Sequence, residues 1–267
     1  MLRVHDPTTD SFREVRVRRP GLIEVCAHVR RAKTRELDLT ALRVLLVADL
    51  IARVAELNGI QAFTTHFEDV DDSTGTHAFG LAPESLGIHP PAPSSPVEDG
   101  LGAQCDGPAD VHVIGPRASP RVPGGITTAI GTAYCNENGD KNGALAAKVT
   151  SEPGGDPLAV KLALSSIPYF QPAVIRAETL TSALDRLDRW RHQVARWAES
   201  LSRPVPSLLK TNFHEFFDQL ATWSVIQVLN EFADKADVPP GAKFETFVFA
   251  DRILGLDLAR SVGQPSG

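Results

Sequence analysis

Strand and helix patterns alternate in the first half of the chain. Residues 22–29 (LIEVCAHV) form a largely apolar, β-branched run, as expected of a strand buried on both faces. Residues 39–57 carry apolar side chains at intervals of three and four, which predicts a helix that ends at Asn58-Gly59. Residues 60–67 (IQAFTTHF) are typical of the next strand. This order predicts a βαβ unit and therefore a parallel sheet.

A segment without periodic pattern follows, and then further strands. Residues 73–108 contain a Pro-rich stretch and several glycines, which predicts a long surface loop. Residues 109–115 (ADVHVIG) and 127–134 (TTAIGTAY) have the composition of strands, and residues 144–149 predict a last short one. The first half therefore predicts an α/β core.

Helical periodicity dominates from residue 156 onward. Asp156 is a good N-cap, and Pro157 suits the first helical position. Further helices are predicted from Leu180 to Leu201, where Trp190 and Trp197 fall on one apolar stripe, and over residues 207–233 and 244–256. We therefore expect a helical bundle after the α/β core, with the boundary near residues 151–156.

Composition and charge narrow the functional classes. The 267 residues are 42% hydrophobic and 22% charged, which is ordinary for a globular protein. A net charge of −6 argues against a polybasic nucleic-acid binder. The chain has no run near the roughly 18 apolar residues of a membrane span, and its start has no apolar signal-peptide core. Three widely spaced cysteines do not suggest a disulfide framework, so we expect a cytoplasmic protein.

Several segments, in order along most of the chain, carry a family resemblance. Residues 48–72 (ADLIARVAELNGIQAFTTHFEDVDD) end in the D-V-D-D of "FDVIRRYLEYRGYEVTYVQNITDVDD", residues 23–29 (IEVCAHV) match "YVCGPTVYD", and residues 109–116 (ADVHVIGP) match "DIHGGG". Residues 2–15 and 155–190 match the opening and the segment that joins core to helices. The chain thus resembles cysteinyl-tRNA synthetase, a class I aminoacyl-tRNA synthetase, and its shorter relative, the mycothiol cysteine ligase.

The resemblance implies a fold and a reaction, and the reaction's signatures are missing. The implied fold is a Rossmann-like (HUP-type) parallel-sheet core over residues 1–155, a helical bundle over 156–260 and a flexible tail over 261–267. The family activates its amino acid on ATP with the HIGH and KMSKS signatures, which stabilise charge on the phosphates. The HIGH position falls on residues 38–41 (DLTA), followed by the family's arginine as Arg43. We therefore expect no adenylation.

The second signature is also incomplete. The KMSKS loop maps to residues 139–145, where Lys141 stands at the first lysine and Ala144 replaces the second. Lys141 and Arg43 remain the candidate catalytic residues, and ATP remains a candidate cofactor.

A zinc site is also implied by the resemblance, and it too is incomplete. The family reads its substrate thiol with zinc held by two cysteines, a histidine and a glutamate. Cys26 matches the first cysteine and Cys105 the second, but the segment that supplies the other two ligands is replaced. Two thiols, even with His112 added, fall short of the usual four ligands, so we expect no metal and keep Cys26 and Cys105 as its candidate ligands.

Candidate ligand-binding residues gather at the predicted strand ends, where open α/β folds bind ligands. Each also has a plain structural interpretation: an acidic cap and solvated turn for the D-V-D-D cluster, a partly buried histidine for His66, and a small buried apolar residue for Cys26. The candidate substrate-binding residues are Cys26, His28, His66, Glu68, Asp69, Asp72 and His112.

The predicted function follows from the resemblance and its gaps. We expect a cysteinyl-tRNA synthetase-like pseudoenzyme that does not charge tRNA, lacks the anticodon-binding domain, and keeps a pocket for an amino-acid-like or aminoacyl ligand or a partner-binding role. One alternative is a repurposed ATP-dependent cysteine ligase of secondary metabolism. Another is a structural partner of a synthetase-like enzyme, recognised through the helical half. The expected partners are a small amino-acid-like ligand or a protein, with a homo-oligomer left open.

Overall fold

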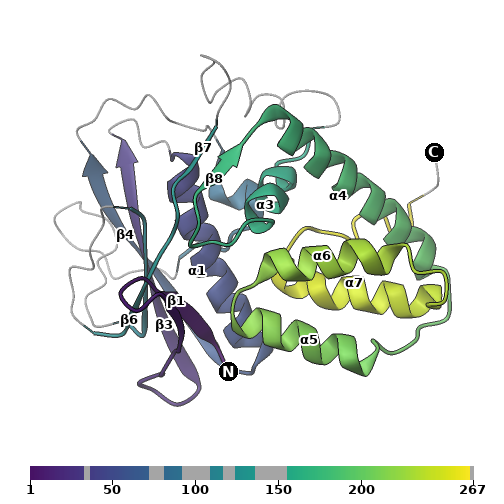
Figure 1. Ribbon diagram of the computed structural model, residues 1–267, viewed down its shortest axis with the longest axis horizontal. Coiled ribbons are helices and arrows are strands. Elements are labelled where there is room, and N and C mark those ends of the chain that lie inside the picture. The colour runs from purple at the N-terminus through teal and green to yellow at the C-terminus, as the bar shows by residue number, and fades with distance from the viewer. Residues whose placement is uncertain (33–36, 72–80, 92–108, 117–123, 136–154, 265–267) are drawn as a thin grey trace.

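A four-stranded parallel sheet forms the centre of the first half (Figure 1), with strand order β4-β3-β5-β6. The computed structural model describes residues 1–32, 37–71, 81–91, 109–116, 124–135 and 155–264, with the backbone alone for residues 30–32 and 68–71. The sheet comprises β3 (Leu22–Ala32), β4 (Gln61–Asp71), β5 (Val111–Ile114) and β6 (Ile126–Ala129). The chain therefore has the α/β, Rossmann-like architecture that the sequence predicts.

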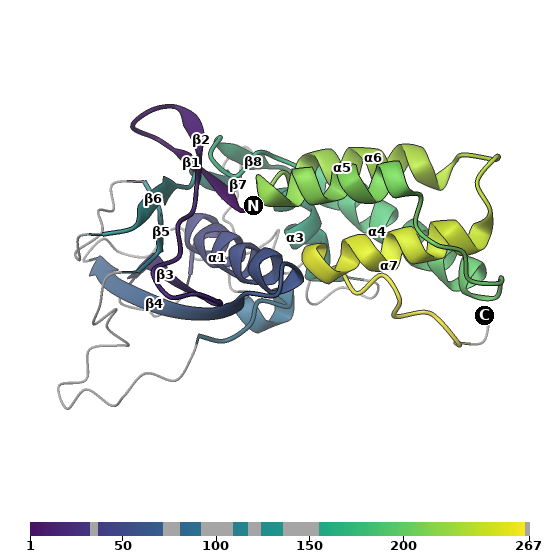
Figure 2. The same cartoon turned by 90° about the horizontal axis from the view of Figure 1, so that it is seen from below.

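Helix α1 (Leu39–Leu57) connects β3 to β4 and lies against one face of the sheet. Figure 2 shows it between these strands and the C-terminal helices. Because both sides of the helix are covered, most of its residues are buried. Asp38 caps its first turn by accepting a hydrogen bond from the N–H of Ala41 at 2.7 Å. The bounds of this helix agree with those predicted from the periodicity.

The strand order contains a topological switch point. From β3 the chain moves to β4 on one side and then returns to β5 on the other side of β3. Open α/β sheets bind ligands in the crevice beyond the strands that flank such a point. The register there pairs Cys26 with His112 and His28 with Ile114.

The predicted strand over residues 127–134 is in fact two strands in different sheets. After β6, β7 (Ala133–Cys135) pairs in parallel with β8 (Ala173–Ile175), a strand inside the region predicted to be helical. Gly131 lies so close to the backbone of Gln171 that a Cβ there would stand 2.1 Å from the Gln171 carbonyl oxygen. This close approach carries the chain out of the main sheet. The strand predicted over residues 144–149 lies outside the described residues.

The second half is helical, and one hydrophobic cluster joins it to the sheet. The helix predicted over residues 207–233 is divided because Leu220 adopts a φ of 55°, where an α-helix cannot continue. Trp190 is fully buried and packs edge-to-face on Phe247, which confirms its place in the core. The helices are α3 (Leu158–Ser165), α4 (Ala177–Ala198), α5 (Ser207–Asp218), α6 (Thr222–Ala233) and α7 (Pro240–Leu254).

Smaller elements complete the fold. Strand β1 (Arg3–Asp6) forms an antiparallel hairpin with β2 (Ser11–Glu14). The 3-10 helix η1 (Pro83–Leu86) lies within the predicted surface loop, yet Leu81, Leu86 and Ile88 are buried because η1 packs against α1 and α3. Among the helices of the described ranges, none combines the length and the apolar character needed to cross a membrane.

Candidate functional site

Cys26, His28 and His112 converge on one face of the sheet at the switch point. Successive side chains of a strand alternate between faces, so Cys26 and His28 share a face of β3, and the register places His112 of β5 beside Cys26. All three are buried, with exposed fractions of 0, 5 and 0%. The intervening Val25 and Ala27 belong instead to the main hydrophobic cluster. The structure thus assembles three of the predicted ligand-binding residues.

The two histidines contact each other directly. His28 Nε2 lies 3.0 Å from His112 Nδ1, so one imidazole donates a proton and the other accepts it. Burial lowers the pKa of His112; the Gly124 backbone opposes this shift, and the positive charge of Arg18 adds to it. Nε2 of His112 is buried and makes no hydrogen bond of ordinary geometry in the part of the chain that the structure describes. Burial therefore favours the neutral form of the His112 imidazole, whose Nδ1 bonds to His28.

The sulfur of Cys26 lies next to this pair. One ligand atom from each of Cys26, His28 and His112 falls within 4.8 Å of the other two. Cys26 is disulfide-bonded, whereas the thiol of Cys135 is not in a disulfide. Cys105, the other candidate metal ligand, lies outside the described residues.

The donor set fits zinc chemically. Zinc prefers imidazole nitrogen and thiolate sulfur, and this buried cluster contains two imidazoles and one cysteine sulfur. A sulfur held in a disulfide is not a thiolate, so Cys26 can serve as a ligand only after reduction. The sequence counted Cys26 and His112 toward a metal, and the structure adds His28.

A buried carboxylate fixes the strands that present these residues. Asp110, just before β5, accepts hydrogen bonds from the backbone N–H and Nε of Arg18 at 3.0 and 2.9 Å, and from the backbone N–H of Glu24 at 2.9 Å. This bond to Asp110 raises the pKa of Arg18. Asp110 therefore holds β5 in register with β3. Asp110 was not among the residues predicted from the sequence, although its position two residues before His112 could have indicated a role in placing that histidine.

An aromatic side chain borders the cluster. Phe67 of β4 shares the sheet face because its residue pairs with His28, and the two ring centroids are 5.7 Å apart. Together with Ala109 and Cys26, it forms a small apolar cluster separate from the main core. The site is thus two imidazoles and a sulfur against an apolar wall.

Of the remaining predicted ligand-binding residues, His66 is the one whose side chain falls within the described residues, and it does not join this group. His66 lies on the opposite face of β4, because its residue pairs with Ala27, and it lines a cavity of about 230 Å³ beside Asp49 and His89. The backbone of Glu68 and Asp69 belongs to β4, but their side chains are outside the description. Asp72 and Lys141 also lie outside the described residues.

Arg43, a candidate catalytic residue of the sequence, holds loops in place. Its guanidinium is 1% exposed and donates to the carbonyl oxygens of Gly131 and Gln171 at 3.2 and 2.6 Å. It also donates to those of Ile167 and Pro168 at 3.2 and 2.9 Å. Burial lowers its pKa to about 10, so it remains charged at neutral pH. The backbone uses both terminal nitrogens of Arg43, leaving neither for a phosphate.

The N-terminus of α1 is also engaged by the protein itself. A helix N-terminus binds phosphate through unpaired backbone N–H groups. Here the Asp38 carboxylate takes the N–H of Ala41 and adds a negative charge. The hydroxyl of Thr40 donates to the Ala133 oxygen at 3.1 Å and accepts from the Ala133 N–H at 2.9 Å. This end of α1 is therefore poorly suited to an anionic ligand.

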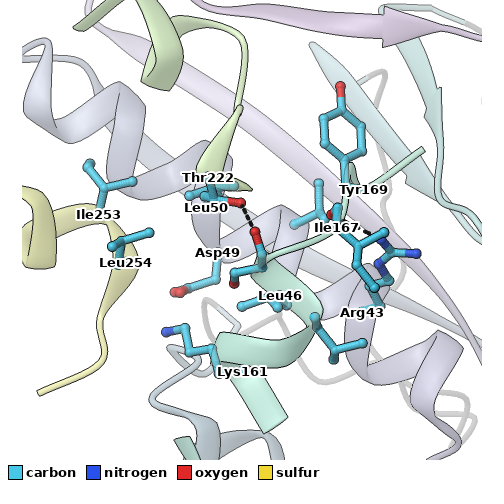
Figure 3. A pocket seen from close by; sticks show the side chains of 13 residues that line it. Arg43, Leu46, Asp49, Leu50, Lys161, Ile167, Tyr169, Thr222, Ile253 and Leu254 are labelled. Carbon is cyan, nitrogen blue, oxygen red and sulfur yellow. Dashed lines mark hydrogen bonds between the residues drawn. The ribbon is translucent and has the colours of Figure 1, made fainter. Parts of the chain in front are cut away.

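A cavity of about 20 Å³ between α1, α3 and α7 has room for a water molecule but not for a substrate (Figure 3). Asp49 and Lys161 both line it. Asp49 accepts from Arg53 Nε and His89 Nδ1, each at 2.7 Å, and Lys161 Nζ donates to the Gly255 oxygen at 3.2 Å. Burial lowers the pKa of Lys161 to about 8. The residues that line this cavity come from both the sheet half and the helical half.

The chemistry available at Cys26, His28 and His112 is hydrogen bonding by imidazole, coordination of a metal, and thiol–disulfide exchange at sulfur. Among the described residues that surround these three side chains, we find no phosphate-binding loop. Comparison of the chain with models of known protein families and with curated proteins finds no match.

Proposed function

We propose that the chain is a cysteinyl-tRNA synthetase-like protein that binds a small amino-acid-like ligand beside Cys26, His28 and His112, on the sheet face that β3 and β5 share, and does not activate it with ATP. The observation that carries the proposal is the convergence of Cys26, His28 and His112 at the switch point of the sheet. Buried titratable side chains that lie together at the end of a sheet are frequent at functional sites.

The side chains suit a compact polar ligand with an apolar portion. A neutral imidazole can accept a hydrogen bond from an ammonium group or donate one to a carboxylate. Phe67 supplies apolar contact beside His28. An amino acid with a short side chain combines these features, which agrees with the substrate class that the resemblance implies.

Two features support binding without adenylation. Catalysis of phosphoryl chemistry needs cationic or N–H groups directed at the phosphates. At the position of the HIGH signature Asp38 is a helix cap, and the guanidinium of Arg43 is bonded to backbone oxygens. The alternative, an ATP-dependent cysteine ligase, would require Asp38 and Arg43 to give up these contacts and to bind the phosphates of ATP.

Amino-acid-dependent ATP–pyrophosphate exchange on the pure protein tests the second half of the proposal. We expect no exchange with any standard amino acid while an authentic cysteinyl-tRNA synthetase is active in the same assay. Clear exchange with any amino acid would establish an active ligase and overturn this half.

Calorimetric titration with the same amino acids tests the first half. We expect at least one to bind, and His28→Ala to weaken that binding at least tenfold, or about 1.4 kcal/mol. His192→Ala, on the exposed face of α4, is the matched control and should leave the affinity unchanged. Absence of binding by every amino acid, or equal affinities in both variants, would contradict the proposal.

A further inference from the structure

We propose that Cys26, His28 and His112 form a binding site for a zinc-class divalent cation, and that the site is open only when Cys26 is reduced. This inference deepens the proposed function. Metal binding itself does not depend on that function, but a role of the metal in binding the amino-acid-like ligand rests on it. The resemblance implies a zinc ligand at Cys26, whereas His28 of β3 and His112 of β5 are at positions for which it implies none.

The geometry of the three residues is the first argument. Their ligand atoms lie within 4.8 Å of one another, and His28 Nε2 and His112 Nδ1 are already 3.0 Å apart. A metal ion bound by these two nitrogens replaces the hydrogen bond between them: the bridging proton moves, through solvent, to the other nitrogen of the ring that donated it, so that both imidazoles bind the metal in the neutral form. The three residues then supply three of the four positions that zinc usually takes.

Rigid support is the second argument. Residues that ligate a metal well are held by neighbouring contacts that fix their orientation. Cys26 and His28 sit in the middle strand of the described sheet, and Asp110 locks the start of β5 next to His112. His112 is fully buried, and its ring is held by the surrounding packing together with its 3.0 Å hydrogen bond to His28.

The state of the sulfur is the third argument. The disulfide of Cys26 occupies the atom that a metal would use. A dithiol reductant attacks the disulfide, leaves as a cyclic disulfide, and returns two electrons and two protons to the protein as two thiols. Metal binding then displaces the thiol proton of Cys26 into solvent and forms the metal–sulfur bond. Oxidation reverses the sequence and removes a ligand from the site.

Co²⁺ binding to the full chain, followed anaerobically by visible absorption, tests the inference directly. Protein reduced with a dithiol and freed of the excess is expected to bind one Co²⁺ with tetrahedral and sulfur-to-metal bands, and Zn²⁺ should displace it. Protein left oxidised is expected to give no such bands. Binding that is equal in both states, or that lacks a sulfur-to-metal band, would overturn the proposal.

Variants assign the ligands. Cys26→Ser should abolish the sulfur-to-metal band, and His28→Asn and His112→Asn should each weaken Co²⁺ binding at least tenfold. Matched controls are His66→Asn, on the opposite face of the neighbouring strand, and Cys135→Ser, whose thiol is outside the disulfide. Both controls should bind as the parent does, and circular dichroism confirms that each variant is folded. Unchanged Co²⁺ affinity in the two histidine variants would exclude these residues as ligands.

The outcome is separable from that of the proposed function. Amino-acid binding is measured by calorimetry on the same preparations without Co²⁺. Co²⁺ binding without amino-acid binding would leave the metal site standing and remove the proposed function, and the converse result would do the opposite.

Discussion

Two buried polar clusters of this protein differ in what their side chains contact. The guanidinium of Arg43 donates to four backbone carbonyl oxygens. His28 and His112 instead contact one another, next to the sulfur of Cys26. On the resemblance alone, Arg43 is a candidate catalytic residue and the two histidines are candidate ligand-binding residues, with nothing to rank one above the other. The difference teaches that a buried cation bonded to backbone oxygens maintains the fold, whereas two buried imidazoles that contact each other can exchange that contact for a ligand.

Removal of Arg43 gives the largest effect expected from this contrast. Arg43→Met leaves four backbone carbonyl oxygens without the donor that the buried guanidinium supplies, so we expect a loss of about 3 kcal/mol or more in the free energy of unfolding. Urea denaturation measures it. Arg189→Met, on the exposed side of α4, is the control and should change stability by less than about 0.5 kcal/mol. Equal losses in the two variants would remove the structural role of Arg43.

Lys161 sharpens the comparison through the pH dependence of stability. Burial holds its pKa at about 8 in the folded protein, against an ordinary value of 10.5. Between these two values the unfolded chain binds more protons, so the contribution of Lys161 to stability rises with pH, by about 3 kcal/mol over the window. Lys161→Met should lack this rise, as measured by urea denaturation at pH 7.5 to 10.5. Parallel profiles for parent and variant would show that Lys161 is not desolvated as described.

The cap of α1 gives a smaller effect. Asp38→Ala removes the carboxylate that accepts from the N–H of Ala41, and we expect a loss of about 1 kcal/mol in stability. Because Arg43 stays bonded to the backbone, the variant should still show no ATP–pyrophosphate exchange. Exchange activity gained by this single change would mean that the α1 terminus is a phosphate site masked only by Asp38.

The histidine pair gives the smallest effect on stability. Replacing both partners of a buried hydrogen bond by apolar groups of similar size can be nearly neutral. His28→Leu combined with His112→Leu is therefore expected to change the free energy of unfolding by less than about 1 kcal/mol in urea denaturation. A loss as large as that of Arg43→Met would place the pair in the same structural class as Arg43.

The pattern of apolar and polar residues predicted those helices and strands whose bounds are set by neighbouring residues in the sequence. The helix at Leu39–Leu57 has strong periodicity and a cap at Asp38, and its bounds agree with the prediction. The break at Leu220 was not predicted, because tertiary packing imposes a positive φ on a residue that rarely adopts one. The departure of the chain from the main sheet near Gly131 likewise depends on a distant partner, Gln171.

The candidate site was predictable in part for the same reason. Alternation along a strand places Cys26 and His28 on one face, but only the register shows that His112 joins them and that His66 does not. The role of Arg43 depends on carbonyl oxygens about 90 to 130 residues away in sequence, which a linear pattern does not reveal.

The ¹H–¹⁵N spectrum of the histidine side chains tests the central claim most directly. The full chain, labelled with ¹⁵N-histidine and assigned with His28→Asn and His112→Asn, is titrated with each standard amino acid. The account predicts that a binding amino acid shifts the ring signals of His28 and His112, and leaves those of His192 and His214 in the helical half unchanged. A spectrum in which no amino acid moves the His28 and His112 signals, or in which only other histidines respond, would contradict the account.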